Sequence, residues 1–511
     1  MTSKLLVYFV VSLLICLTTG YQISQFQQKK DHYGLIKDPQ QENNGEAFFN
    51  QRFILVDDYF NEKSEVDEGK QVELVTSSGI DLEALQKLDL SQKNHTIFLY
   101  TGGPGPIEEF YKNSGYVLEL AKYYGALVFF VEHRFYGESL PFGESSFDES
   151  YLPYLSVDQV TADYMYLIYF YKYALGISDA QIITFGSFYA GSLASYMRFK
   201  YPDHITGALA SGAPLRMADE FETRSTYWET VTSIFKGGSE DGDKVVALVE
   251  SGFDTLHELS TWSPRSQGYA QITTLMNTCE PVNDSNYQDL LKIIRNSFAQ
   301  LALLNYPFPA NGFPANTVKV ASGIVYDAPR DVDALHDVVA FYYGTDKDDC
   351  IDIEDPIINC ADPTGCYNGT RGVAWDFQLC WEYLPEIGSS IDNSMFANLP
   401  WTKEDLDAYC GSLFSGLPEG GRYQWFKINY WGSKVFSASN VIWTNGQLDP
   451  WFGTGIITNS STPYLNTLSA IPGASHGLDL MTPVEGDGMG KYREMELELI
   501  GQILDGTFPS S

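Results

Sequence analysis

Cysteine is scarce in this sequence, with 7 in 511 residues. No two cysteines stand in a C-x-x-C pair, which argues against a structural zinc site of the usual spacing. Cys16 lies in the N-terminal apolar run, and the others lie in the second half of the chain before residue 411. This even set predicts disulfides, but the sequence does not choose among the 15 pairings. Its members are Cys279, Cys350, Cys360, Cys366, Cys380 and Cys410.

Basic residues are also few. Lysine and arginine total 32, against 66 aspartates and glutamates, so the formal net charge is −34. Nucleic acids and anionic membranes carry the same sign of charge, and this balance argues against both as partners. Protonation of carboxylates at acid pH would relieve the self-repulsion, which fits a lysosome or a gut lumen. Many neutral secreted proteins are acidic too, so charge alone leaves the compartment open.

Long apolar runs are absent after the N terminus. Residues 1–20 place one lysine before an apolar run of about a dozen residues and end on small polar residues and Gly20, the pattern of a cleaved secretory signal peptide. No later run reaches the roughly 20 residues that span a bilayer, so we expect no membrane anchor after cleavage. The sequence therefore predicts a secretory-pathway protein, extracellular or lysosomal. Candidate glycosylation sites are Asn94, Asn283, Asn368 and Asn459.

Strand-like and helix-like segments alternate at both ends of the chain, which predicts a mostly parallel sheet covered on both faces. Between them, helical patterns and the six cysteines indicate an insertion. We expect an α/β-hydrolase body with a large helical cap. The expected strands are 97–100, 126–131, 181–185, 205–211, 440–444 and 467–471, and the expected helices include 157–176, 227–235, 245–259, 287–304 and 495–504. The expected divisions are a signal peptide (1–20), a body (21–213 plus 427–511) and a cap (214–426).

Two residues follow late strands in the order that such a body requires of its acid and its histidine. Asp449 lies in TNGQLDPWFG and could orient an imidazole. His476 lies in IPGASHGLDL and could act as a general base. Either residue alone would be read as a turn or cap residue, but the pair in this order predicts descent from a catalytic pair.

The stretch TFGSFYAGSLA, after the strand 181–185, resembles a nucleophile elbow. Such a turn needs small residues two positions before and two positions after its centre. Gly186 and Ala190 meet this requirement when the centre is Phe188, whereas centring it on Ser187 would put aromatic rings at both positions. The nucleophile position is therefore predicted to be Phe188, with Ser187 as an alternative, displaced nucleophile. GASHG also matches G-x-S-x-G, but no histidine follows it, so Ser475 is discarded.

An oxyanion hole in such a fold uses the amide after the nucleophile and one from the loop after an early strand. The first is Tyr189. The second belongs to the TGGPGP loop, where we assign Gly103; Pro104 has no amide to give. The same loop could equally be a plain tight turn.

Several stretches together resemble one family. DHY, NQRF, EHRFYGES, TFGSFYAGSLASYMRFKYP, GALASGAP, TNGQLDPW and IPGASHGLDL are similar to the serine exopeptidases that include prolyl carboxypeptidase, dipeptidyl peptidase II and the thymus-specific serine peptidase. The resemblance implies cleavage beside proline near a peptide terminus, with Asp449 and His476 as the acid and the histidine. The elbow of that family usually reads G-G-S-Y-x-G, which puts its serine on Phe188. Pro104 and Gly477 are further departures.

Three functions remain open at this point. The first is a catalytically impaired exopeptidase homologue that retains a peptide- or partner-binding cleft. The second is an active proline-directed exopeptidase, with Ser187 as nucleophile or with an error or unusual allele at codon 188. The third is a luminal structural or storage glycoprotein. No metal or organic cofactor is expected, peptides are the expected ligands, and a homodimer is a candidate assembly.

Overall fold

The structure is a computed structural model that describes residues 21–34, 47–60, 75–76, 79–80, 95–218, 226–346, 349–353, 360–383, 387–416, 422–457 and 467–508. The predicted signal peptide, Asn94 and Asn459 lie outside these residues. The strands are β1 (Ile23–Lys29), β2 (Phe48–Val56), β3 (Val75–Thr76), β4 (Gly79–Ile80), β5 (Thr96–Thr101), β6 (Leu127–Val131), β7 (Gln181–Ser187), β8 (Gly207–Ser211), β9 (Val441–Gly446) and β10 (Thr467–Ile471).

The helices fall into two groups along the chain, those of the N- and C-terminal parts and those between β8 and β9. The first group is α2 (Ile107–Asn113), α3 (Gly115–Tyr124), α4 (Val157–Leu175), α5 (Tyr189–Lys200) and α15 (Gly490–Leu504). The second group is α6 (Thr226–Gly237), α7 (Gly242–Ser260), α8 (Arg265–Leu275), α9 (Tyr287–Leu303), α10 (Thr317–Asp327), α11 (Asp331–Tyr343), α12 (Gly369–Trp381), α13 (Lys403–Leu413) and α14 (Tyr423–Tyr430). Short 3-10 helices are η1 (Gly143–Phe147), η2 (Leu152–Tyr154), η3 (Leu215–Ala218), η4 (Gly432–Ser437) and η5 (Pro450–Thr454).

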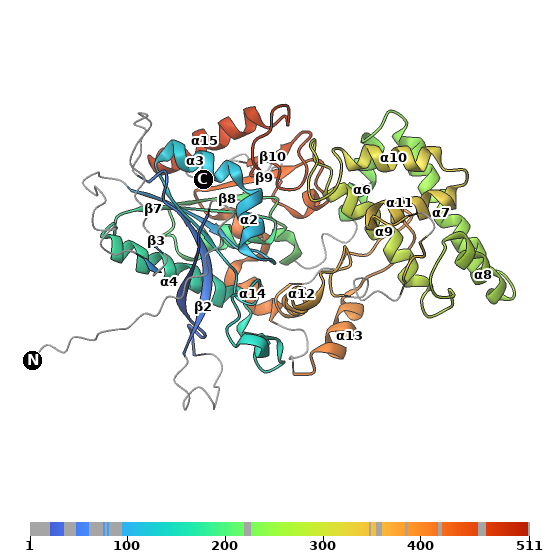
Figure 1. Ribbon diagram of the computed structural model, residues 1–511, viewed down its shortest axis with the longest axis horizontal. Helices are drawn as coiled ribbons and strands as arrows, with labels where there is room; N and C mark the ends of the chain where they lie inside the picture. Colours follow the sequence, from blue (N-terminus) through green and yellow to red (C-terminus); the bar gives the residue numbers. More distant parts are fainter. Residues whose placement is uncertain are drawn as a thin grey trace, which may run out of the picture.

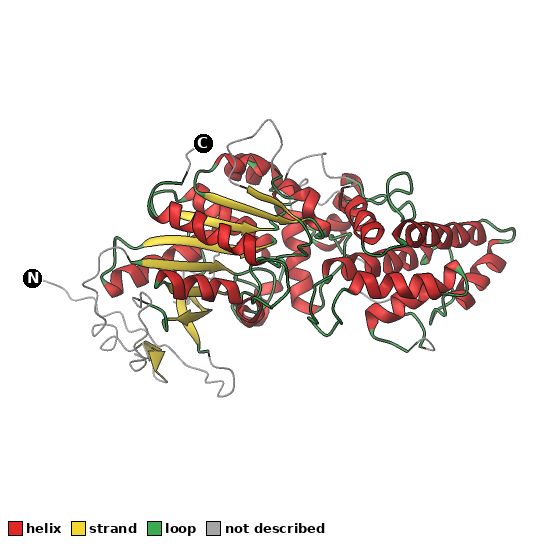
Figure 2. Cartoon of the chain, turned by 90° about the horizontal axis from the view of Figure 1, so that it is seen from above, coloured by secondary structure: helices red, strands yellow, loops and turns green. Residues whose placement is uncertain are grey.

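One sheet of eight strands organises the body, in the order β1-β2-β6-β5-β7-β8-β9-β10. The pairs from β6 to β10 are parallel, whereas β1 and β2 add an antiparallel edge. Figure 2 shows the strands layered between helices. A mostly parallel sheet covered on both faces, with a sharp turn from β7 into α5, is the α/β-hydrolase fold that the sequence predicts. The expected strands are all present, but the sequence analysis did not anticipate β1 and β2.

Alternation along β5 explains how the sheet separates two hydrophobic layers. Ile97 and Leu99 pack into the layer that contains residues of α4 and α5. Phe98 and Tyr100 pack into the layer that contains residues of α2, α3 and α15. Both faces of β5 are buried, which is why the strand reads as a continuous apolar run rather than as an alternating one.

Local signals define α4, the long helix under the sheet. Ser156 caps its first turn by accepting a hydrogen bond from the amide of Gln159. Gly176 ends it in the left-handed conformation, with φ of 68°, where glycine has no Cβ penalty. The expected helix at 157–176 therefore agrees with the observed Val157–Leu175 to one residue.

The segment between β8 and β9 is helical, as expected, and Figure 1 shows α6 to α11 gathered at one end of the molecule, away from β2. Its cysteines pair as Cys279–Cys350, Cys360–Cys366 and Cys380–Cys410. The expectation of disulfides is therefore confirmed. The domain boundaries at 213/214 and 426/427 stay predictions. Across the ranges that the structure describes, no helix combines the length and the apolarity needed to cross a membrane.

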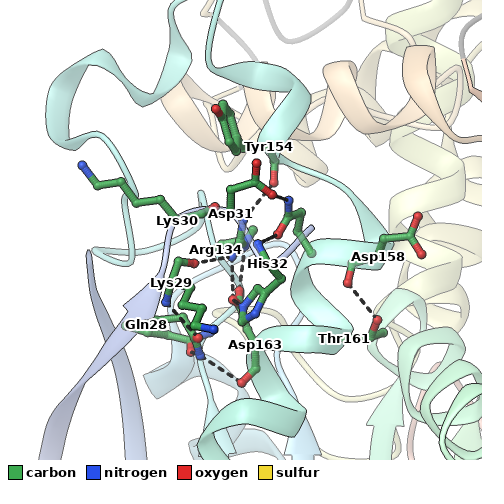
Figure 3. A network of polar contacts seen from close by, with 12 residues as sticks. Gln28, Lys29, Lys30, Asp31, His32, Arg134, Tyr154, Asp158, Thr161 and Asp163 are labelled. Atoms are coloured by element: carbon green, nitrogen blue, oxygen red, sulfur yellow. Dashed lines mark hydrogen bonds and ion pairs between the residues drawn. The ribbon is translucent and has the colours of Figure 1, made fainter. Parts of the chain in front are cut away.

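Motifs far apart in the sequence meet in a buried polar network (Figure 3). The guanidinium of Arg134, from EHRFYGES, donates to both carboxylate oxygens of Asp163 at 2.6 and 2.5 Å. The ring of His32, from DHY, lies 2.8 Å from the same carboxylate. Asp163 and Arg134 are fully buried, so each needs the other's charge. This network joins the N-terminal segment to α4.

Asp158 of α4 joins the body to α14. Its carboxylate accepts hydrogen bonds from Lys200, from Tyr430 at 2.8 Å and from Arg422 at 3.1 Å. Nearby, the Glu382 carboxylate accepts the amide of Val157 at 2.8 Å. These contacts connect the start of α4 to the last part of the segment between β8 and β9, from the end of α12 to α14.

Candidate active site

Asp449 and His476 meet beyond the ends of β9 and β10. The Nδ1–H of His476 donates to Oδ2 of Asp449 at 2.9 Å, and Oδ1 accepts the amide of Trp451 at 2.9 Å. The side chain of Asp449 is 1% exposed and that of His476 is 17% exposed. The carboxylate is therefore fixed in orientation, and it holds the imidazole with Nε2 directed away from the acid.

Two opposing effects set the charge of His476. Burial, the largest single effect, disfavours the imidazolium, but the charge of Asp449, its hydrogen bond and the charge of Asp479 together outweigh burial. The pKa of His476 is consequently raised above its ordinary value. Such an imidazole accepts a proton readily, which is the property that a general base requires.

The elbow is a strained turn centred on Phe188. Its backbone has φ of 58° and ψ of −128°, a combination that is rare for a residue with a side chain. A Cβ on Gly186 would overlap the carbonyl group of Ala190, so the residue two positions before the centre has to be glycine. The amide of Phe188 donates to the carbonyl oxygen of Ser211 at 2.9 Å, which anchors the turn to β8. The small-residue argument thus identifies the strained position.

The Phe188 side chain lies within an aromatic group rather than against a polar partner. Its ring centroid is 5.5 Å from that of His476, in an edge-to-face arrangement, and 5.0 Å from that of Trp451. Trp375, from α12, is 5.9 Å away. These distances are typical of aromatic pairs, and none of these contacts supplies an oxygen or sulfur nucleophile.

Ser187 lies at the end of β7, beside the loop of the histidine. Its Oγ is so near Gly477 that a Cβ there would overlap it, and Gly477 has φ of 61°. Within the described part of the chain, no hydrogen bond joins Ser187 to the ring of His476. Both residues nevertheless line one cavity, which also includes Phe188.

The amides assigned to an oxyanion hole lie near the elbow. Tyr189 is the first residue of α5, and the first amides of a helix have no partner inside it. A Cβ added to Gly103 would lie 3.6 Å from Cβ of Ala190, which brings this glycine next to the same turn. Gly105 differs, because its amide donates to the carbonyl oxygen of Gly103 at 2.8 Å.

Two cavities meet at Phe188, Tyr367 and His476. One, of about 250 Å³, extends into the helical insertion past Asn296, Gln300 and Tyr342. The other, of about 200 Å³, extends toward α2 and the loop after β10. The sequence analysis did not identify Tyr367, Trp375 or Trp451 as site residues. Only Trp451 carried a signal, because it lies in the TNGQLDPW motif.

Other predicted sites lie apart from this centre. Asn283 and Asn368 are exposed, as glycosylation requires, and their modification stays a prediction. Ser475 is buried and donates to the carbonyl oxygen of Asn305. Among the described residues, no group of three or more histidine, cysteine or acidic side chains is placed to hold a metal ion.

Comparison with known proteins adds the family. The profile of the family described as serine carboxypeptidase S28 matches residues 86–494. The chain belongs to this family. The lysosomal Pro-X carboxypeptidase of Homo sapiens is 28% identical over 491 residues, which cover 94% of this chain and 87% of that protein. The prolyl carboxy peptidase like protein 5 of Caenorhabditis elegans is 30% identical over 452 residues, covering 82% and 85%.

The expected resemblance to a serine exopeptidase family is therefore confirmed, and this S28 member is a prolyl carboxypeptidase-like protein of a hydrolase family. Among solved structures, the proline iminopeptidase of Mycobacterium smegmatis is 12% identical with a TM-score of 0.32, covering 81% of this chain and 91% of that one.

Proposed function

We propose that this protein is a catalytically impaired serine-exopeptidase homologue that binds peptides in its cleft without cleaving them. The observation that carries the proposal is Phe188 at the centre of the strained elbow, with its ring 5.5 Å from that of His476. The neighbouring Asp449–His476 pair retains the hydrogen bond that a base would need.

The chemistry of the elbow supports loss of turnover. In a serine peptidase, the histidine takes a proton from the hydroxyl that attacks the carbonyl carbon, and an acyl-enzyme forms. The benzyl group of Phe188 has no proton to give to Nε2 and no lone pair for attack. Removing the nucleophile of a serine protease lowers turnover by roughly 10⁶. The oxyanion-hole amides and the histidine would therefore retain little activity without it.

The composition of the larger cavity supports peptide binding. Its wall combines the rings of Tyr342, Tyr367 and Trp451 with the amides of Asn296 and Gln300. Ligand pockets commonly pair an apolar lining with a few convergent polar groups. One relative is named a Pro-X carboxypeptidase, and this name supports proline-containing peptides as the proposed ligands. A proline ring would pack on these aromatic faces, and the amides would bond to the peptide backbone.

An active exopeptidase that uses Ser187 is the second candidate. In its favour, Ser187 and His476 line the same cavity. Against it, Ser187 lies in the last position of β7 and not at the strained turn, and its Oγ faces Gly477. A rearranged elbow would be required to bring that oxygen to Nε2, and the anchoring of Phe188 to Ser211 opposes such a change.

The proposed setting is the secretory pathway, ending outside the cell or in lysosomes. The predicted signal peptide, the three disulfides and the lysosomal relative support it. A homodimer and glycosylation of the four sequons are part of the same proposal.

The test uses the secreted protein and two variants, Phe188→Ser and Ser187→Ala. Each is exposed to a fluorophosphonate label and to proline-containing peptides at pH 5 and pH 7.5. We expect no labelling or turnover by the natural protein and a gain of either property in Phe188→Ser. Labelling of the natural protein that Ser187→Ala abolishes would instead make Ser187 the nucleophile. Failure to bind any peptide would favour the structural glycoprotein.

A further inference from the structure

Among the described residues, four arginines are buried, and one of them differs from the others in its partners. Arg52, Arg134 and Arg493 each form an ion pair with a carboxylate. Arg295, in α9, is 2% exposed, and its hydrogen bonds go to neutral groups of the described chain. A buried guanidinium without a counter-ion is costly, and an anion beside it reduces that cost.

Neutral groups hold the guanidinium of Arg295 in place. One face stacks on the indole of Trp228, with Cζ 4.0 Å from the ring centroid. Its N–H groups donate to the Ser389 hydroxyl at 3.1 Å, to the Pro363 carbonyl oxygen at 2.7 Å and to the Asn296 amide oxygen at 3.3 Å. An arginine has five N–H donors, so these three bonds leave two. Burial lowers the pKa of Arg295 to about 9, which still leaves the group charged at neutral pH.

Arg295 lines a cavity of about 90 Å³ inside the helical insertion. Gln288 and Lys292 line it from the same helix, at the spacing that aligns side chains on one helix face. Lys292 adds a second positive charge, although it also pairs with Asp289 at 3.0 Å. No aspartate or glutamate is among the described lining residues. We name this space the Arg295 cavity; its other lining residues are Cys360, Pro363, Leu399, Pro400, Trp401 and Tyr409.

An indole N–H supplies a further donor from another segment of the chain. Trp401 lines the Arg295 cavity, and its buried Nε1 has no hydrogen-bond partner among the described residues. A buried indole N–H usually has a partner, so this one indicates room for an acceptor. The cavity therefore brings together two cationic side chains, an indole N–H and the amide of Gln288.

We propose that the Arg295 cavity binds an inorganic oxyanion, sulfate or phosphate, between Arg295, Lys292 and the indole N–H of Trp401. Guanidinium groups match the oxygens of such ions through paired hydrogen bonds. One water needs only roughly 10–15 Å³, so the volume of about 90 Å³ suits a tetrahedral ion better than a single halide. The site shares no lining residue with the two cavities that meet at His476, and it does not depend on the proposed function.

A bound oxyanion would stabilise the helical insertion. The cavity lies where α9 meets the loop of the Cys360–Cys366 disulfide and the segment that leads into α13. The anion would neutralise the buried charge of Arg295 at this junction and accept hydrogen bonds from more than one of these segments. Because the junction exists only in the folded chain, the unfolding temperature should rise with the concentration of the anion.

The experiment titrates the purified protein with sulfate, phosphate or chloride at constant ionic strength, in a background of gluconate, which is too bulky for the cavity. Unfolding temperature and calorimetry are the two measurements. We expect a saturable rise in unfolding temperature with sulfate or phosphate and one binding site per chain, and chloride should need at least roughly tenfold higher concentrations, since it offers one acceptor atom in place of several. The stronger of the two oxyanions identifies the ligand. Equal effects of chloride and the oxyanions would overturn the proposal, as would no saturable response to any of them.

Variants assign the binding to the cavity. Arg295→Gln should weaken oxyanion binding about tenfold or more, the change expected from loss of a hydrogen bond to a charged group. Trp401→Phe removes one donor from a half-buried ring, and it tests the site even if Arg295→Gln fails to fold. Trp381→Phe is the matched control, because its buried Nε1 also has no described partner but lies outside this cavity. An equal response of the natural protein and of all three variants would be a general salt effect and would overturn the proposal.

Discussion

The acid–histidine pair and the elbow contact each other, yet they differ in what they contribute. Asp449 and His476 have the hydrogen bond and the burial that catalysis by a serine hydrolase requires. The elbow has a strained backbone, with φ of 58° at Phe188, and carries a phenylalanine side chain at the predicted nucleophile position. The backbone of the turn is thus specified by Gly186 and by the anchoring to Ser211, and not by the nucleophile.

Under the proposed function, a strained turn is retained without catalytic activity. Strained residues cluster at functional sites because the surrounding structure over-determines them. Here the surrounding contacts persist around a residue that cannot react. If the two parts are independent, each can be altered without changing the other.

Restoring a hydroxyl should produce the largest change. Phe188→Ser would put a nucleophile beside a base that is already oriented, and the loss of such a group in a serine protease costs roughly 10⁶ in turnover. If the rest of the site is intact, the variant should hydrolyse a reactive ester orders of magnitude faster than the natural protein. Adding Asp449→Asn should lower this gained rate by about 10⁴, since the histidine loses its orientation and its charge partner. A gain that survives Asp449→Asn would show that the pair takes no part.

The backbone conformation of the elbow can be disrupted without changing the side chain of Phe188. Gly186→Ala would place a Cβ onto the carbonyl group of Ala190, and we expect a loss of about 3 kcal/mol in the free energy of unfolding, the upper end for overpacking. Gly323→Ala is the control, because its Cβ would meet no atom within 4 Å inside α10. That change should stabilise the protein by up to about 1 kcal/mol. Similar unfolding midpoints in denaturant for the two variants would contradict the tight-turn argument.

A third prediction concerns pH and the contact between body and insertion. Burial raises the pKa of Glu382 to about 7 although Arg422 opposes the shift. Because the unfolded chain releases this proton near the ordinary pKa of glutamate, about 4.3, the contribution of Glu382 makes the folded state less stable as pH rises from there to about 7. Glu382→Gln should flatten this dependence, measured as the unfolding temperature at pH 5 and pH 7.5.

Two other glutamates, the exposed Glu119 and the buried Glu132, serve as comparisons for Glu382. Glu119→Gln on α3 should leave the profile unchanged. Glu132, whose pKa burial also raises to about 7, should retain part of the dependence in Glu382→Gln. A profile that Glu382→Gln does not alter would show that the charge of Glu382 does not influence folding.

The smallest effect is expected at the motif that the sequence analysis rejected. Ser475 donates to the carbonyl oxygen of Asn305 and is buried. Ser475→Ala should cost about 1 kcal/mol of stability, the usual value of one hydrogen bond, and should not change the rate gained by Phe188→Ser. A loss of that rate at unchanged stability would indicate that Ser475 takes part in the reaction.

Sequence patterns predicted the elements that local signals define. The apolar runs of β5 and β6 and the capped helix α4 agree with expectation within about a residue, since burial on both faces leaves an unbroken run. β1 was missed because its polar residues alternate with few apolar ones, and its pairing with β2 depends on residues far along the chain. Tertiary context, not propensity, defines such an edge strand.

The candidate site likewise contains residues that sequence motifs predicted and residues that they did not. Asp449, His476 and the centre of the elbow carried motif signals, so their positions could be read from spacing. Trp375 could not be predicted, because α12 reaches the cleft only through the packing of the insertion. The network of Arg134, Asp163 and His32 was equally hidden, since three distant segments supply its members.

The order of the strands has a consequence for biosynthesis. β8 pairs in parallel with β9, although the entire helical insertion separates them along the chain. A ribosome therefore releases the elbow and the TGGPGP loop well before β9, and Asp449 and His476 emerge later than both. Because non-local strand pairing is slow, β8 would present an unpaired edge until β9 is made, and such an edge is prone to aggregation and is a target for chaperones. Any truncation before β9 would yield a chain with an elbow and no site.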